Sequence, residues 1–198
     1  MHRAQGVGLL WLLTAVTPAV GQAAITGIVL TERPGAIDAV VYLVPTNGLV
    51  RAPADAGSMI DQVGLRYRPT VSAVLPGTTI EFKNSDALLH NVFSPAGPGA
   101  GFDLGTFSSR ETRQYTFDEI GTHIILCHVH PEMYAYVLVV PTPYVAVAED
   151  TGRFRIEDVP AGRYTVRVWH RRDQGFEREL VVEPNGNVEL TIDLMSRR

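Results

Sequence analysis

The segment from Cys127 to Met133 reads Cys-His-Val-His-Pro-Glu-Met, and His90 lies upstream of it in the run Leu-Leu-His-Asn-Val. Cys127, His130, Met133 and His90 together offer one thiol, two imidazoles and one thioether. Soft-ligand chemistry assigns this set to a trigonal copper centre with one cysteine, two histidines and a weak axial methionine, whereas zinc rarely recruits methionine. These four residues therefore predict a mononuclear copper site.

The three ligands of this segment are expected on a turn between two strands. Residues 121–127 form a β-branched run that ends at the thiol, and residues 134–140 form a second apolar run. Because a strand advances about 3.3 Å per residue, only a tight turn, stiffened by Pro131, brings the three side chains around one ion. His90 must then come from the end of a neighbouring strand.

The motif Cys127-x-x-His130-x-x-Met133, with the upstream His-Asn-Val, resembles the cupredoxins. The ligand loop is similar to the short loop of the amicyanins, the methylamine-utilisation type of blue copper protein. Residues 76–84, followed by the upstream histidine, are similar to the strand and loop that deliver the first histidine in plastocyanin-type proteins. The resemblance covers residues 57–141.

This resemblance implies a role for each matching residue. Cys127, His130 and His90 would be the equatorial ligands of one type 1 copper ion, and Met133 would be its axial ligand. Asn91 would stand behind the ligands and tie the two ligand loops together by hydrogen bonds.

Two further histidines lie close to the motif but are not expected to bind the ion. His123 has the strand parity of Cys127 but lies four residues earlier, about 13 Å along an extended strand, so we expect it in the interior or at the rim. His128 follows Cys127 directly and points the opposite way, so we expect it to be solvent-exposed. A role for His128 in proton-coupled redox tuning is the alternative.

The start of the chain, residues 1–23, reads as a secretory signal peptide. A basic residue precedes a short apolar run, and Gly-Gln-Ala supplies small residues before the expected cleavage point. The run is short for a membrane span, so we expect none after cleavage, with an uncleaved anchor as the alternative. We expect export to the periplasm of a Gram-negative host. The chain has a single cysteine, which cannot form an internal disulfide, and metal ligation would protect such a thiol in an oxidising compartment.

Composition limits the possible partners. The 198 residues are 45% hydrophobic and 19% charged, and the formal net charge is −4. This is enough chain for one large or two small domains. The basic residues are scattered among acidic ones and form no basic patch, so nucleic acid is excluded as the expected partner.

The pattern along the chain predicts an all-β fold. Short runs rich in β-branched and aromatic residues alternate with Pro-Gly, Asn-Gly and Asp-Thr-Gly turns. In addition to the two strands at the motif, the sequence predicts strands over residues 25–30, 39–44, 71–75, 78–84, 113–117, 145–148, 152–156, 164–170, 177–183 and 188–194. No helix of ordinary length is required.

The ends of the chain are expected to form a second small β-sandwich. Residues 152–166 resemble the carboxypeptidase regulatory-like, transthyretin-like sandwich, and the strands in 24–50 look like the first two of that family. On this reading the cupredoxin, a Greek-key β-sandwich over 57–141, is inserted between 24–50 and 142–198. The alternative is tandem packing, but neither flank alone closes a sandwich. The run Trp169-His170-Arg171-Arg172 is expected to consist of ordinary packing and turn residues, with a docking patch as the alternative.

The predicted function is single-electron transfer without catalysis, because four protein ligands leave no vacant position for a substrate. By the resemblance, His130 would be the electron port, and the partner would be a c-type cytochrome or a periplasmic dehydrogenase. A copper-handling protein is one rival, recognisable by rapid transfer of Cu(I) to a chelator. A structural module with a vestigial site is another. A hydrolase using Cys127 as nucleophile lacks an orienting acid and an oxyanion motif.

Overall fold

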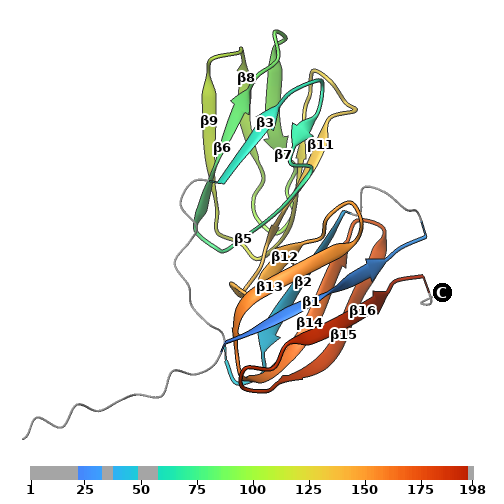
Figure 1. Cartoon of the computed structure of the whole chain (residues 1–198). Helices are drawn as coiled ribbons and strands as arrows, with labels where there is room; N and C mark the ends of the chain where they lie inside the picture. Colours follow the sequence, from blue (N-terminus) through green and yellow to red (C-terminus); the bar gives the residue numbers. More distant parts are fainter. Residues whose placement is uncertain (1–21, 33–37, 49–57, 196–198) are drawn as a thin grey trace, which may run out of the picture.

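The computed structural model describes residues 22–32, 38–48 and 58–195, and these residues form strands and no helix. The predicted all-β fold class is therefore confirmed. Figure 1 shows two β-sandwiches, one above the other. We call the one built from residues 58–139 the central sandwich and the one built from residues 22–45 and 145–193 the terminal sandwich. Within the described residues, no helix is long and apolar enough to cross a membrane.

The terminal sandwich joins strands from both ends of the described chain. Strand β1 (Gln22–Leu30) lies in the middle of one sheet, antiparallel to β13 (Arg153–Pro160) and parallel to β16 (Val188–Asp193). Apolar and charged residues alternate along β13, so Phe154 and Ile156 enter the core while Arg153 and Arg155 face solvent. One sheet has the order β13 (Arg153–Pro160), β1 (Gln22–Leu30), β16 (Val188–Asp193), and the other has the order β12 (Val145–Val147), β2 (Ala39–Pro45), β14 (Gly162–His170), β15 (Asp173–Val182).

The beginning of β1 overlaps the predicted signal peptide. Residues 1–21 lie outside the described residues. Gln22 and Ala23, assigned from the sequence to the end of that segment, are the first two residues of β1 and pair with Pro160 and Val159. Ala23 is buried in the core of the terminal sandwich. The strand thus starts two residues before the boundary read from the sequence.

The central sandwich encloses a separate apolar core. In β6 (Thr78–Asn84), Ile80 and Phe82 are fully buried and alternate with the outward-facing Thr79 and Glu81. Its sheets have the orders β4 (Tyr67–Arg68), β3 (Ser58–Gln62), β6 (Thr78–Asn84), β9 (Thr112–Phe117) and β5 (Val71–Val74), β11 (Tyr134–Val139), β10 (Gly121–Leu126), β7 (His90–Ser94), β8 (Phe102–Phe107).

Every strand predicted from the sequence is present, most with bounds that differ by one to four residues. The bounds of β6, 78–84, are those predicted, whereas β13 continues four residues beyond the predicted end. Four strands of the central sandwich were not predicted: β3, β4, β7 and β8. Of these, β7 matters most, because it begins at His90.

An apolar interface joins the two sandwiches. One buried cluster contains Val71 and Leu138 of the central sandwich, Val140 directly after it and Val40 of β2. Trp169 packs against this cluster. Trp169 also lies 5.2 Å, centroid to centroid, from Tyr136. Burial of this apolar surface stabilises the contact between the two sandwiches. Trp169 is thus a packing residue, as predicted.

Candidate metal centre

Three of the predicted ligands come together at one end of the central sandwich. The nearest donor atoms of His90, Cys127 and His130 all lie within 4.8 Å of one another. His90 and Cys127 are buried, while His130 is half-buried. His90 is the first residue of β7, and the other two lie on the loop between β10 and β11. One histidine from the start of β7 and two residues of a loop 37 and 40 positions later in the sequence therefore supply one group of donors.

The loop that carries Cys127 and His130 closes a hairpin. Strands β10 and β11 are antiparallel, and Leu126 and Tyr134 form the pair next to the loop. Cys127 and Met133 are thus the first and last loop residues, and the Met133 N–H donates to the His130 carbonyl over 2.9 Å. Met133 is 1% exposed and belongs to the same buried cluster as Cys127. The tight turn between two strands was predicted correctly.

The two histidines face each other through Nδ1. These nitrogens are 3.0 Å apart, and the ring planes are inclined by 61°. Two imidazole nitrogens at about 2.0 Å from one ion, at a tetrahedral angle, would lie about 3.3 Å apart. The observed separation is therefore close to what a shared ion requires. A thiol and two imidazoles, with a buried thioether in the same loop, are donors that fit copper.

Asp86 fixes the orientation of the His90 ring. Its Oδ2 lies 2.8 Å from His90 Nε2, and its two oxygens accept hydrogen bonds from the N–H groups of Gly64 and Leu65. Burial acts to raise the pKa of Asp86, but these hydrogen bonds and His90 outweigh it, so the pKa is lowered. The ionised carboxylate holds the Nε2 proton and leaves the Nδ1 lone pair free for a metal.

Asn91 connects the two segments that carry the ligands. Its N–H donates to the sulfur of Cys127 at 3.4 Å, and its side-chain oxygen accepts from the His128 N–H at 3.3 Å. The side-chain amide donates to Asp103 at 2.7 Å. These contacts link the segments of His90 and Cys127, and they fix the side-chain orientation of both Asn91 and the thiol.

Tyr67 lies beneath the same segments. Its hydroxyl is 2.8 Å from the carbonyl oxygen of Asn91 and 3.0 Å from that of Leu126, so one hydroxyl hydrogen is shared between the residues that flank the site. Tyr67 is 1% exposed. Burial, followed by the charge of Cys127, raises its pKa, so the hydroxyl stays a donor. The sequence analysis did not identify Tyr67 or Asp86.

The other two histidines lie where they were expected. His123 is 7% exposed, contacts the Glu119 carbonyl through Nε2 and packs edge-on against Phe117. The His128 side chain is 58% exposed, stacks on Phe93 and lies 3.5 Å from Asp103. Neither residue belongs to the donor group of His90, Cys127 and His130.

A comparison of the chain with models of known protein families finds no match. Among solved structures, a Cu(I) form of an amicyanin mutant is 29% identical and aligns over 44% of this chain and 85% of its own, with a TM-score of 0.41. A second amicyanin mutant, in the reduced state, is 28% identical over 49% of this chain and 96% of its own, also with a TM-score of 0.41. A purple cupredoxin from Nitrosopumilus maritimus is 22% identical over 42% of this chain and 99% of its own, with a TM-score of 0.38.

Proposed function

We propose that this chain is an exported copper protein of the cupredoxin type that carries single electrons between redox partners. The observation that carries this proposal is the convergence of His90, Cys127 and His130 at one end of the central sandwich. With Met133 as axial ligand they would hold one type 1 copper ion. Bound copper would supply the Cu(II)/Cu(I) couple.

The surroundings of the donors favour electron transfer over catalysis. His90 and Cys127 are buried, and each is held from outside by a hydrogen bond, to Asp86 and Asn91 respectively. Ligands fixed in this way keep their positions when the charge of the ion changes, which lowers the cost of electron transfer. Four protein ligands leave no position for a substrate, so we do not assign an enzymatic activity.

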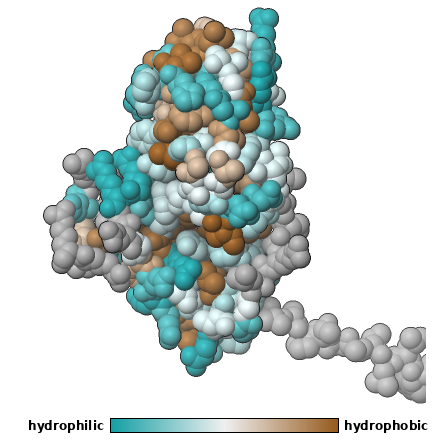
Figure 2. Space-filling model, turned by 180° about the vertical axis from the view of Figure 1, so that it is seen from behind, coloured by the Kyte–Doolittle hydropathy of each residue, from teal (hydrophilic) through white to brown (hydrophobic). Residues whose placement is uncertain are grey.

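The exposed side of the site suits a protein partner. His130 is the half-buried ligand, so we infer that electrons pass through its ring. Leu88, Leu89 and Val129 are 51%, 55% and 45% exposed and belong to the loops that carry the ligands. Figure 2 shows hydrophobic residues gathered at this end of the central sandwich. An apolar surface around a redox site favours a partner such as a c-type cytochrome or a periplasmic dehydrogenase.

We propose that the terminal sandwich serves as a scaffold for the central one. Its strands and core come from residues 22–45 and 145–194, and those of the central sandwich come from 58–139. We propose that the central sandwich is a cupredoxin domain inserted in a carboxypeptidase regulatory-like domain. The signal-like N-terminal segment and the single cysteine support export to the periplasm.

The proposal is tested by loading the metal-free protein with copper and recording voltammograms. We expect one copper per chain and one reversible one-electron wave. As a comparison, His123→Ala should bind copper with the same stoichiometry, because His123 is buried away from the donor group. Copper that passes at once to a Cu(I) chelator, without a reversible wave, would indicate copper handling in place of electron transfer.

A further inference from the structure

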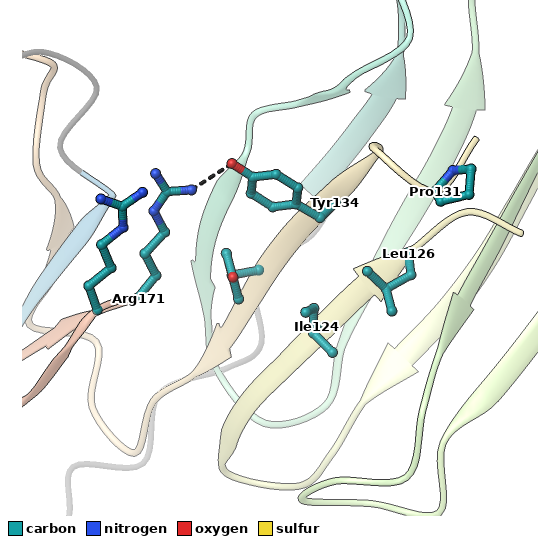
Figure 3. A pocket seen from close by; sticks show the side chains of 7 residues that line it. Ile124, Leu126, Pro131, Tyr134 and Arg171 are labelled. Atoms are coloured by element: carbon teal, nitrogen blue, oxygen red, sulfur yellow. Dashed lines mark hydrogen bonds between the residues drawn. The ribbon is translucent and has the colours of Figure 1, made fainter.

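The terminal sandwich contacts the central one directly beside the ligand loop. Arg171, in the turn after β14, donates a hydrogen bond through Nη1 to the hydroxyl of Tyr134. Its guanidinium also lies 5.7 Å from the centre of the Tyr134 ring. Figure 3 shows this contact bridging the two sandwiches. Tyr134 follows Met133, the last residue of the loop, so the contact reaches the end of the loop that offers the thioether.

Arg171 is itself fixed to the terminal sandwich. Its Nε lies 3.0 Å from Oδ2 of Asp38, next to the start of β2, and the two side chains are only 24% and 14% exposed. A partly buried, charge-assisted hydrogen bond is stronger than one in full contact with water. The planar guanidinium of Arg171 therefore contacts Asp38 through Nε and Tyr134 through Nη1, and so connects the two sandwiches.

The β10–β11 backbone pairing joins both ends of the ligand loop, but the side chains at the two ends are held by different parts of the molecule. At the first end, Asn91 and Tyr67 hold Cys127 and the preceding carbonyl, and both belong to the central sandwich. At the last end, the side-chain hydrogen bond of Tyr134 comes from Arg171 of the terminal sandwich. A change at the sandwich interface can therefore act on the Tyr134 side chain, next to Met133, without changing the hydrogen bonds at the Cys127 end.

The space around this contact would permit such movement. Arg171 and Tyr134 line a groove of about 380 Å³ together with Leu126 and Pro131, which flank the ligands Cys127 and His130 (Figure 3). All four of these lining residues are half-buried or exposed. With the hydrogen bond to Arg171 removed, the groove leaves room for the Tyr134 ring and the neighbouring loop residues to shift.

We propose that Arg171 is a positioning residue, through which the terminal sandwich holds the Met133 end of the ligand loop in its metal-binding position. This proposal rests on the proposed copper function, and it gives the terminal sandwich a role in tuning the site. Arg171 acts through the Tyr134 hydroxyl and does not touch the donors of the group formed by His90, Cys127 and His130.

The test compares Tyr134→Phe and Arg171→Gln with the control Arg155→Gln. Arg155 is also paired with a carboxylate, at 2.7 Å from Glu157, but on the solvent-facing side of β13. In the metal-free protein, we expect the Met133 amide, which is bonded to the His130 carbonyl, to exchange its hydrogen about tenfold faster in both loop variants. The control should exchange at the wild-type rate. Arg171→Lys, which keeps the charge but not the planar fork, should restore only part of the protection.

The copper-loaded proteins provide the second measurement. Tyr134→Phe and Arg171→Gln should shift the reduction potential in the same direction, and the double variant should shift it no further than one single variant, because both changes remove the same hydrogen bond. If Tyr134→Phe has the amide exchange rate and the reduction potential of the wild type, the proposal is overturned. Easier unfolding of Arg171→Gln would not rescue it. Failure of all variants and the wild type to bind copper would contradict the proposed function, while the exchange rates would still report whether Arg171 holds the loop.

Discussion

Replacing Tyr67 by phenylalanine removes one hydroxyl and no ring, and it tests how the ligand segments are joined. The hydroxyl is the buried partner of the carbonyl oxygens of Asn91 and Leu126, at 2.8 and 3.0 Å. The two carbonyls share one hydroxyl hydrogen, and removing such a donor while its acceptors stay buried costs about 1–3 kcal/mol. We therefore expect Tyr67→Phe to lower the free energy of unfolding by about 2 kcal/mol. For a chain of this size that corresponds to a fall of about 4–8 °C in Tm.

The assay is thermal unfolding of the metal-free protein, which separates the hydrogen bonds from any effect of copper. Tyr115→Phe is the matched control, because Tyr115 packs in the same sandwich and its hydroxyl has no hydrogen-bond partner within the described residues. We expect the control to change Tm by less than about 2 °C. Equal Tm values for the two variants would refute the inference that Tyr67 ties the segments of Asn91 and Leu126 together.

Three further predictions concern individual side chains at the site. Asp86→Asn should weaken copper binding about 10- to 100-fold in a chelator competition, because Asp86 orients the His90 ring; unchanged affinity would contradict this role. Met133→Leu should retain copper but shift the reduction potential measured by voltammetry, and an unshifted potential would exclude Met133 as axial ligand. The hydrogen bond from the Gly105 N–H, followed by that from Asn91, lowers the pKa of Asp103 in the folded protein. The ionised Asp103 therefore contributes its full stabilisation above the unfolded pKa of about 3.9. This stabilisation is lost as the pH falls through the lower folded pKa. Unfolding of the wild type and Asp103→Asn as a function of pH should therefore differ near neutrality and converge in strong acid; a constant difference would contradict this assignment.

The sequence contains the local part of the site in a readable form. Cys127, His130 and Met133 lie within one short segment between two apolar runs, and their hairpin follows from turn length and strand pattern. The position of His123, buried and away from the donors, and the exposure of His128 follow from strand geometry in the same way. These features depend on residues close together in the chain.

The features that could not be predicted depend on contacts across the fold. Asp86 is an ordinary loop aspartate in the sequence, four residues before His90. Its hydrogen bonds from the N–H groups of Gly64 and Leu65 come from residues 22 and 21 positions away, and no local pattern reveals them. Tyr67 acts through carbonyls 24 and 59 residues away.

The strands that the pattern did not reveal are polar or short. Strand β4 has two residues, and β8 has a glycine and three exposed positions. Strand β7 begins with the buried polar pair His90 and Asn91, so tertiary packing and not propensity makes it a strand.

The visible absorption spectrum of the protein with one equivalent of Cu(II) tests the copper site most directly. A bond between Cu(II) and the thiolate of Cys127 would give intense colour that bleaches on reduction, and Cys127→Ser should bind copper more weakly and remain colourless. His128→Ala should keep the colour, because the His128 side chain is exposed and outside the donor group. A colourless wild-type protein, or equal colour in Cys127→Ser, would contradict a thiolate-ligated copper centre in this chain.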